Sequence, residues 1–98
     1  MNTPETGEIS IHETKVFAAL KQNVRWLTNH EIAQLAGVAE RTARAHSRKL
    51  VDLGIVDRAQ VFPGHRFMLS PAAEERNKQY LTQLEFASGV LGVVTEDS

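Results

Sequence analysis

TNHEIAQLAGVAERTARAHSRKLVDLGIV, residues 28–56, is the stretch that decides the fold of this chain. It begins with the pattern T-x-x-E, in which Thr28 and Glu31 can each accept a hydrogen bond from the other's backbone amide and so start a helix. Gly37 ends that helix, because glycine adopts the left-handed C-cap conformation without steric cost. A second helix is predicted over residues 40–53, where Gly54 follows. The stretch therefore predicts two short helices joined by a tight turn.

The predicted helix 40–53 has two chemically different faces. At about 100° per residue, one side carries Ala43, Ser47 and Leu50, with His46 and Leu53 nearby. The opposite side carries Arg41, Arg44, Ala45 and Arg48. Two short helices with a basic face on the second are the sequence form of a helix-turn-helix, which places its second helix in the major groove of DNA.

We expect the three arginines to contact DNA, because a guanidinium group can hold guanine through two acceptors at once. The alternative is an ordinary solvated helix face. Lys49 lies at the edge of the basic face and is interpreted equally well as a phosphate contact or as a surface residue. His65 and Arg66, beside the turn pair Pro63-Gly64, are placed for contact with the DNA backbone or minor groove, or are ordinary strand residues.

The flanking sequence predicts the remaining elements. Residues 10–22 form a helix with Val16, Phe17 and Leu20 on one apolar stripe, and residues 25–27 suit a brief strand. The helix that starts at Thr28 is expected to bury Ile32, Leu35 and Ala36, and Trp26 and Tyr80 are expected in the core. Two strands, around residues 55–62 and 66–69, would form a hairpin.

The hairpin and the last helix have recognisable local signals. At the turn, Pro63 would preset the first corner and Gly64 would supply positive φ at the second. Ser70-Pro71 starts a C-terminal helix, with the serine as cap and the proline in the first turn. The predicted fold class is mainly α with a small β-hairpin, in the order helix, short strand, helix, helix, hairpin, helix.

This order and its motifs resemble the bacterial winged helix-turn-helix transcription regulators, most closely small members of the multiple-antibiotic-resistance-repressor kind. The matching pieces are L-T-x-x-E-I-A-x-L-A-G-V at 27–38, R-T-A-R-x-H-x-R-K-L at 41–50, V-D-L-G-I-V at 51–56 and F-M-L-S-P at 67–71. The resemblance covers roughly residues 14–87. It implies that Arg41, Thr42, Arg44 and Arg48 face DNA and that the hairpin at Gly64, the wing, lies along the backbone or minor groove.

Two positions depart from the family pattern. Ala39 stands where serine or threonine usually caps the recognition helix, a loss of about 1 kcal/mol that Glu40 partly offsets through the helix dipole. Ser47 stands where an aliphatic residue is usual, so either the core is looser there or the hydroxyl bonds back to its own helix. Neither departure removes the basic face.

Composition limits the class of protein. The 98 residues are 42% hydrophobic and 23% charged, which is ordinary for a globular domain. The net charge is −1, but residues 40–66 hold six basic and three acidic side chains, a local charge of +3 that suits a DNA-binding surface. The chain has no cysteine. The N-terminal residues do not resemble a signal peptide and no apolar run is long enough to span a membrane, so a cytoplasmic location is expected.

We expect a disordered tail at 1–8, the DNA-binding domain at 9–70, and a C-terminal helix with a frayed tail at 71–98. The last helix carries an apolar stripe that either covers the first helix or, as we prefer, forms a homodimer interface. The stripe consists of Tyr80, Leu81, Leu84, Ala87 and Leu91.

The sequence therefore predicts a sequence-specific double-stranded DNA-binding protein, a transcriptional repressor since no second domain for recruiting polymerase is seen. The alternatives are a plasmid or phage partition or replication factor and a winged-helix module that binds protein. We expect no enzyme activity and no cofactor, because no nucleophile–base pair or phosphate loop stands out. No metal site is expected, since His12, His30, His46 and His65 lack ligand-like spacing. The sequence leaves any small-molecule effector open.

Overall fold

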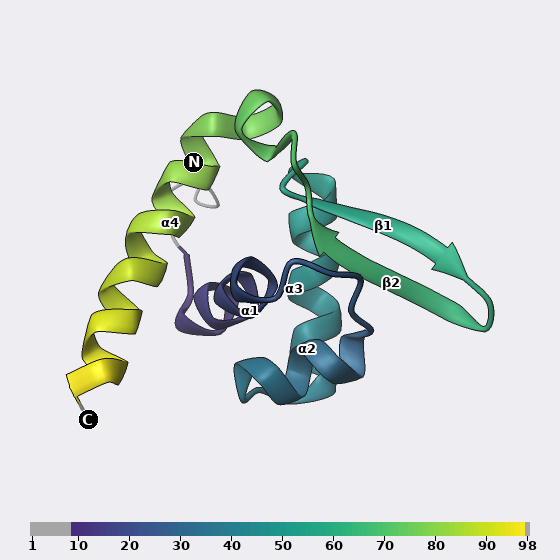
Figure 1. Ribbon diagram of the computed structural model, residues 1–98, viewed down its shortest axis with the longest axis horizontal. Helices are drawn as coiled ribbons and strands as arrows, with labels where there is room; N and C mark the ends of the chain where they lie inside the picture. The colour runs from purple at the N-terminus through teal and green to yellow at the C-terminus, as the bar shows by residue number, and fades with distance from the viewer. Residues whose placement is uncertain (1–8, 98) are drawn as a thin grey trace, which may run out of the picture.

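The computed structural model describes residues 9–97, with side chains described as far as residue 90. Four helices and one antiparallel hairpin follow one another along the chain (Figure 1): α1 Ile11–Gln22, α2 Asn29–Ala36, α3 Glu40–Asp52, β1 Val56–Val61, β2 Gly64–Leu69 and α4 Ala73–Asp97. This is the predicted winged helix-turn-helix, mainly helical with a two-stranded sheet. The hairpin projects from the helical body on the side away from α4.

The helix-turn-helix forms as its local signals predict. Glu31 donates its backbone amide to Thr28 Oγ1 at 3.1 Å, and the Thr28 amide donates to Glu31 Oε1 at 2.9 Å, which completes the capping box. Gly37 takes a left-handed φ of 72° and its amide donates to the Ala33 carbonyl. The turn therefore directs the chain into α3, which ends one residue earlier than predicted, with Leu53 as its cap.

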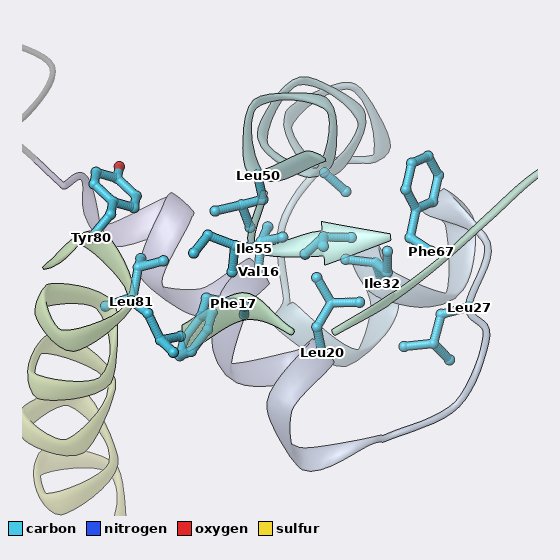
Figure 2. Packing of buried hydrophobic residues seen from close by; sticks show 14 of the residues in the cluster. Val16, Phe17, Leu20, Leu27, Ile32, Leu50, Ile55, Phe67, Tyr80 and Leu81 are labelled. Atoms are coloured by element: carbon cyan, nitrogen blue, oxygen red, sulfur yellow. The ribbon is translucent and has the colours of Figure 1, made fainter. Parts of the chain in front are cut away.

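The core lies where α1, α2, α3, the hairpin and the start of α4 meet (Figure 2). Val16, Phe17 and Leu20 are fully buried, as the α1 stripe predicts. The prediction for Leu35 was wrong: it is 48% exposed, and Ala33 takes the buried position. In an α-helix, Leu35 lies roughly 160° around from Ala33, so a helix that buries Ala33 leaves Leu35 outside.

The predicted strand at 25–27 is reduced to an isolated bridge between Leu27 and Phe67. The two residues exchange both backbone hydrogen bonds, at 2.8 and 2.7 Å. A longer strand does not form because α2 begins immediately afterwards, at its cap Thr28. Trp26 is 42% exposed, against the prediction of a core position. Side chains alternate along extended backbone, so burial of Leu27 turns the neighbouring Trp26 outward.

The hairpin turn also differs from its prediction. Val61 pairs with Gly64, so the two turn residues are Phe62 and Pro63, joined by a cis peptide bond. Gly64 already belongs to β2 and does not have the positive φ that a corner position would give it. The signal in Pro63-Gly64 correctly located a turn but placed it one residue too late.

The last helix starts in two steps. Ser70 Oγ accepts from the Ala72 amide at 3.0 Å, and regular helix begins at Ala73. Asn77 then has non-helical backbone angles and bends the helix. Its side chain accepts from the Tyr80 amide at 3.3 Å and donates to the Leu53 carbonyl at 3.2 Å, which links the bend to the end of α3. Beyond the bend, α4 runs past α1 (Figure 1).

Candidate nucleic-acid interface

The outward face of α3 carries three arginines. Ala43, Ser47 and Leu50 are fully buried and fix the inner face of the helix. Arg41, Arg44 and Arg48 are exposed on the other side, as predicted from the helical wheel. Their spacing of three and then four residues aligns them along about 10 Å of one helix side. Thr42, which the family resemblance places toward DNA, is half-buried at the edge of this face.

Glu40 lies at the N-terminus of α3 and pairs with neighbours on the surface. One carboxylate oxygen lies 3.7 Å from Arg44 Nη2 and the other lies 3.5 Å from His30 Nδ1. The Glu40 and Arg44 side chains are 49% and 63% exposed, and exposed pairs of this kind contribute little to stability. Arg44 can therefore exchange Glu40 for a phosphate or a base at small cost. Ala39 has no side-chain oxygen to cap the helix, so Glu40 is the residue that complements the helix dipole.

Ser47 fixes α3 against α2. Its hydroxyl is fully buried, 2.8 Å from Asn29 Oδ1 and 3.2 Å from the Arg44 carbonyl oxygen. The single hydroxyl hydrogen can donate to either acceptor. The contact with the Arg44 carbonyl agrees with the expectation that the Ser47 hydroxyl bonds back to its own helix. The contact with Asn29 adds a link to the first residue of α2. A polar residue on the buried face therefore helps to set the angle at which the arginine face is presented.

Lys49 points away from the arginine face. Its Nζ lies 3.0 Å from Glu13 Oε1 on α1 and 5.7 Å from the centre of the Tyr80 ring on α4. Glu13 is 1% exposed and also accepts a hydrogen bond from the Tyr80 hydroxyl. The structure therefore places Lys49 in a buried polar cluster, Glu13–Lys49–Tyr80, that joins three helices. The sequence contained one signal for it, a carboxylate one turn before Val16 and Phe17 on the apolar stripe of α1.

Burial shifts the pKa of two side chains in this region. Desolvation, then the hydrogen bond to Glu13, raises the pKa of Tyr80 well above its ordinary value, so the ring stays protonated. Desolvation lowers the pKa of His46, and the nearby charge of Glu13 opposes that effect only in part. The pKa of Glu31 is lowered chiefly by the backbone amide of Thr28 in the capping box.

His65 and Arg66 do not share a face of the wing. Neighbouring residues in a strand point to opposite sides, and the register pairs His65 with Gln60 and Arg66 with Ala59. His65 is exposed, whereas Arg66 is half-buried. Phe62, which no sequence pattern singled out, is 94% exposed at the tip of the wing.

The stripe predicted for a dimer lies largely inside the protomer. Tyr80, Leu81 and Leu84 are at most 9% exposed and belong to the core cluster (Figure 2). Ala87 is half-buried, and the side chain of Leu91 lies outside the described residues. These three core residues therefore cover α1, which was the alternative to a dimer interface. Among the described side chains of α4, the large apolar ones that are exposed are Phe86 and Val90, one turn apart.

Comparison with known proteins identifies the fold. A family model described as winged helix-turn-helix DNA-binding matches residues 9–57, half of the chain. This chain therefore belongs to the winged helix-turn-helix DNA-binding proteins. No curated protein matches the sequence. Among the described residues, none of the helices has the length and apolar character needed to span a membrane.

Solved structures with the same fold come from bacteria and archaea. The ST1889 protein of Sulfolobus tokodaii is 19% identical with a TM-score of 0.63, and the match covers 86% of this chain and 84% of that one. A MarR-family transcriptional regulator from Silicibacter pomeroyi is 18% identical with a TM-score of 0.61, covering 85% and 57%. The adhesin competence repressor AdcR of Streptococcus pyogenes is 13% identical with a TM-score of 0.56, covering 96% and 71%. This chain thus spans little more than half of the Silicibacter regulator.

Proposed function

We propose that this protein is a sequence-specific transcription regulator that places α3 in the major groove of double-stranded DNA and the wing on the backbone or minor groove. The observation that carries this proposal is the exposed row Arg41, Arg44 and Arg48 on the second helix of the motif. The buried inner face of α3 fixes the direction of that row. Arginine is suited to both tasks, since it binds guanine through two acceptors and phosphate through its charge.

We propose repression as the mode of regulation. A small domain that occupies a promoter blocks polymerase without further contacts, and one of the proteins of the same fold is named a repressor. The proposed organisation is a DNA-binding domain at 9–70 and a helix from 71 onward that joins two copies. Two helix-turn-helix units would then contact half-sites about one helical turn, roughly 34 Å, apart.

Selection from a random double-stranded DNA library tests the proposal. The wild type should enrich a defined sequence, and the variant Arg41→Ala/Arg44→Ala/Arg48→Ala should not. The matched control is Lys21→Ala/Arg25→Ala/Lys78→Ala, which removes the same charge from exposed positions outside α3. The proposal is wrong if the wild type enriches nothing, or if both triple variants bind the selected DNA equally well.

A reporter gene tests the mode of regulation. The selected sequence is placed over a promoter, and the protein is expressed with and without the α3 arginines. Repression predicts lower transcription with the wild type only. Higher transcription with the wild type would contradict repression and leave DNA binding intact.

A further inference from the structure

The tip of the wing is apolar and uncovered. Phe62 is 94% exposed, and the adjacent Val61 is 44% exposed. Figure 1 shows this tip at the far end of the hairpin, away from the helical body. Exposed aromatic surface is unfavourable in water, and Phe62 contributes little packing within the protomer. The side chain is therefore available for a contact outside this chain.

Basic residues lie along the two strands behind this apolar tip. Residues 58–73 contain Arg58, His65 and Arg66 and no acidic residue. The nearest carboxylate before them, Asp57 at the base of the wing, is held by Arg76 at 2.9 Å. An apolar tip on a hairpin that carries basic residues fits a partner that has negative charge outside and stacked, apolar surfaces within. Duplex DNA has this combination, with phosphates along the groove edges and base pairs between them.

The position of the wing relative to α3 suggests which part of the duplex it meets. β1 starts four residues after the last residue of α3, so the hairpin cannot move far from the recognition helix. With α3 in the major groove, a projecting hairpin reaches the adjoining minor groove, about 6 Å wide, which admits little more than its tip. Proteins that bind the minor groove often insert apolar side chains between base pairs and bend the duplex.

We propose that Phe62 is an apolar wedge that enters the minor groove beside the α3 site, unstacks one base step and bends the DNA, with Arg58 and Arg66 available to hold the flanking phosphates. This inference rests on the proposed DNA-binding function. The wedge favours a flexible pyrimidine–purine step at a fixed distance from the α3 contacts, because such steps unstack most easily. Phe62 thus adds sequence preference at a position that makes no base-edge hydrogen bond.

The test uses the full-length protein and a duplex selected by the wild type. Fluorescence resonance energy transfer between the duplex ends measures bending, and 2-aminopurine placed at successive steps reports unstacking. Phe62→Ala should bind about 5- to 100-fold more weakly, the range of losing one aromatic–base stack, and should lose both signals. Phe62→Leu should keep part of the bend. Val24→Ala, which truncates a 70% exposed apolar side chain between α1 and α2, is the control and should behave as wild type.

The possible outcomes distinguish failure of the wedge proposal from failure of the proposed DNA-binding function. If the wild type binds and bends DNA and Phe62→Ala binds without bending, the wedge is supported. If the wild type binds without bending, or Phe62→Ala bends DNA as the wild type does, the wedge is wrong and the proposed function stands. If the wild type binds no duplex, the proposed function itself fails. A Phe62→Ala variant that loses affinity while the bend is kept points to contact with the backbone only and also overturns the wedge.

Discussion

Arg41, Arg44 and Arg48 occupy successive places along α3, and this order predicts different effects on DNA binding. Recognition helices contact base edges mainly with their N-terminal residues. Arg41 or Arg44 is therefore expected to hold a guanine, and its change to alanine should cost about 1–3 kcal/mol and relax preference at one base pair. Arg48, two turns into α3, is expected to meet phosphate. Arg48→Ala should weaken all sequences alike and lower the salt slope by about one unit per half-site.

Anisotropy titrations at several salt concentrations distinguish the two roles. Thermal melts are the control, because exposed side chains contribute little to folding stability. Equal losses on all sequences for all three variants would contradict base recognition by these arginines. Unchanged affinity in every variant would remove the basis for the proposed interface.

His46 predicts how stability depends on pH. Its pKa in the folded protein is lowered from the ordinary 6.5, so folding favours the neutral ring and the unfolded chain binds the proton more readily. The stabilisation that the neutral His46 ring contributes is fully present above the pKa of His46 in the unfolded chain. It is lost as the pH falls through that pKa toward the lower pKa of the folded protein. The charges nearest to the ring belong to Glu13, Lys49 and His12. Denaturation in urea should therefore show a loss of stability as the pH falls through the ordinary histidine value of 6.5.

His46→Gln should make this part of the pH profile flatter. His65→Gln, on the exposed wing, is the matched control and should keep the slope of the wild type. An identical slope in His46→Gln and wild type would show that another group causes the pH dependence.

The cluster Glu13–Lys49–Tyr80 joins α1, α3 and α4 and so helps to hold α3 against the other two helices. The Lys49 side chain is 35% exposed, but its partner carboxylate is 1% exposed. Removing Lys49 leaves a buried charge with one partner fewer, and breaking such a pair is costly. We expect Lys49→Met to lower the free energy of unfolding by about 2–3 kcal/mol, below the fully buried case because the lysine is partly solvated. Urea denaturation measures this change in the free energy of unfolding.

Lys21→Met supplies the comparison. Lys21 Nζ lies 3.8 Å from Glu85 with both side chains 46% exposed, so that pair should contribute about 0–1 kcal/mol. In the double variant Glu13→Gln/Lys49→Met, the loss in free energy of unfolding should be smaller than the sum of the losses in the two single variants, since no buried charge remains. If Lys49→Met were as mild as Lys21→Met, the cluster would not contribute to the stability of the helix junction.

Elements whose signals lie within a few residues of one another could be predicted from the sequence. Contacts between residues far apart in the chain could not. The capping box at Thr28 and Glu31 and the left-handed Gly37 act within a few residues, so the sequence predicted α2, the turn and α3 correctly. The burial of Leu27 at the expense of Trp26 depends on pairing with Phe67, forty residues away. Such contacts leave no periodic signal, so the sequence did not predict that Trp26 is exposed.

The candidate site shows the same division. The arginine face follows from the period of a single helix, and the structure places Arg41, Arg44 and Arg48 outside as predicted. Lys49 lies one residue from Arg48, but its direction is set by Glu13, 36 residues earlier in the chain. The exposure of Phe62 depends on where the hairpin turns, which the sequence placed one residue too late.

At the scale of the whole molecule, α4 and the wing lie on opposite sides of the helix-turn-helix (Figure 1). A contact between two copies through α4 would therefore leave both wings free. The part of α4 nearest its start is not available, because Tyr80, Leu81 and Leu84 are buried against the protomer. Leu84→Glu would unfold the domain and could not report on a dimer. As far as residue 90, the large apolar residues that remain exposed on α4 are Phe86, 74% exposed, and Val90, 51% exposed.

We therefore expect a homodimer formed through the side of α4 that carries Phe86 and Val90. Their spacing of four residues places them on one helix face, and pairing that face with its copy removes apolar surface from water. Sedimentation at micromolar concentration should give twice the chain mass for the wild type, and Phe86→Glu/Val90→Glu should shift it toward the monomer with its helical circular dichroism retained. Phe62→Glu, which adds a charge at the 94% exposed phenylalanine of the wing, should stay dimeric. A monomeric wild type, or a Phe86→Glu/Val90→Glu variant that remains a dimer, would show that α4 does not join two copies through this face, and the half-site spacing of about 34 Å would lose its basis.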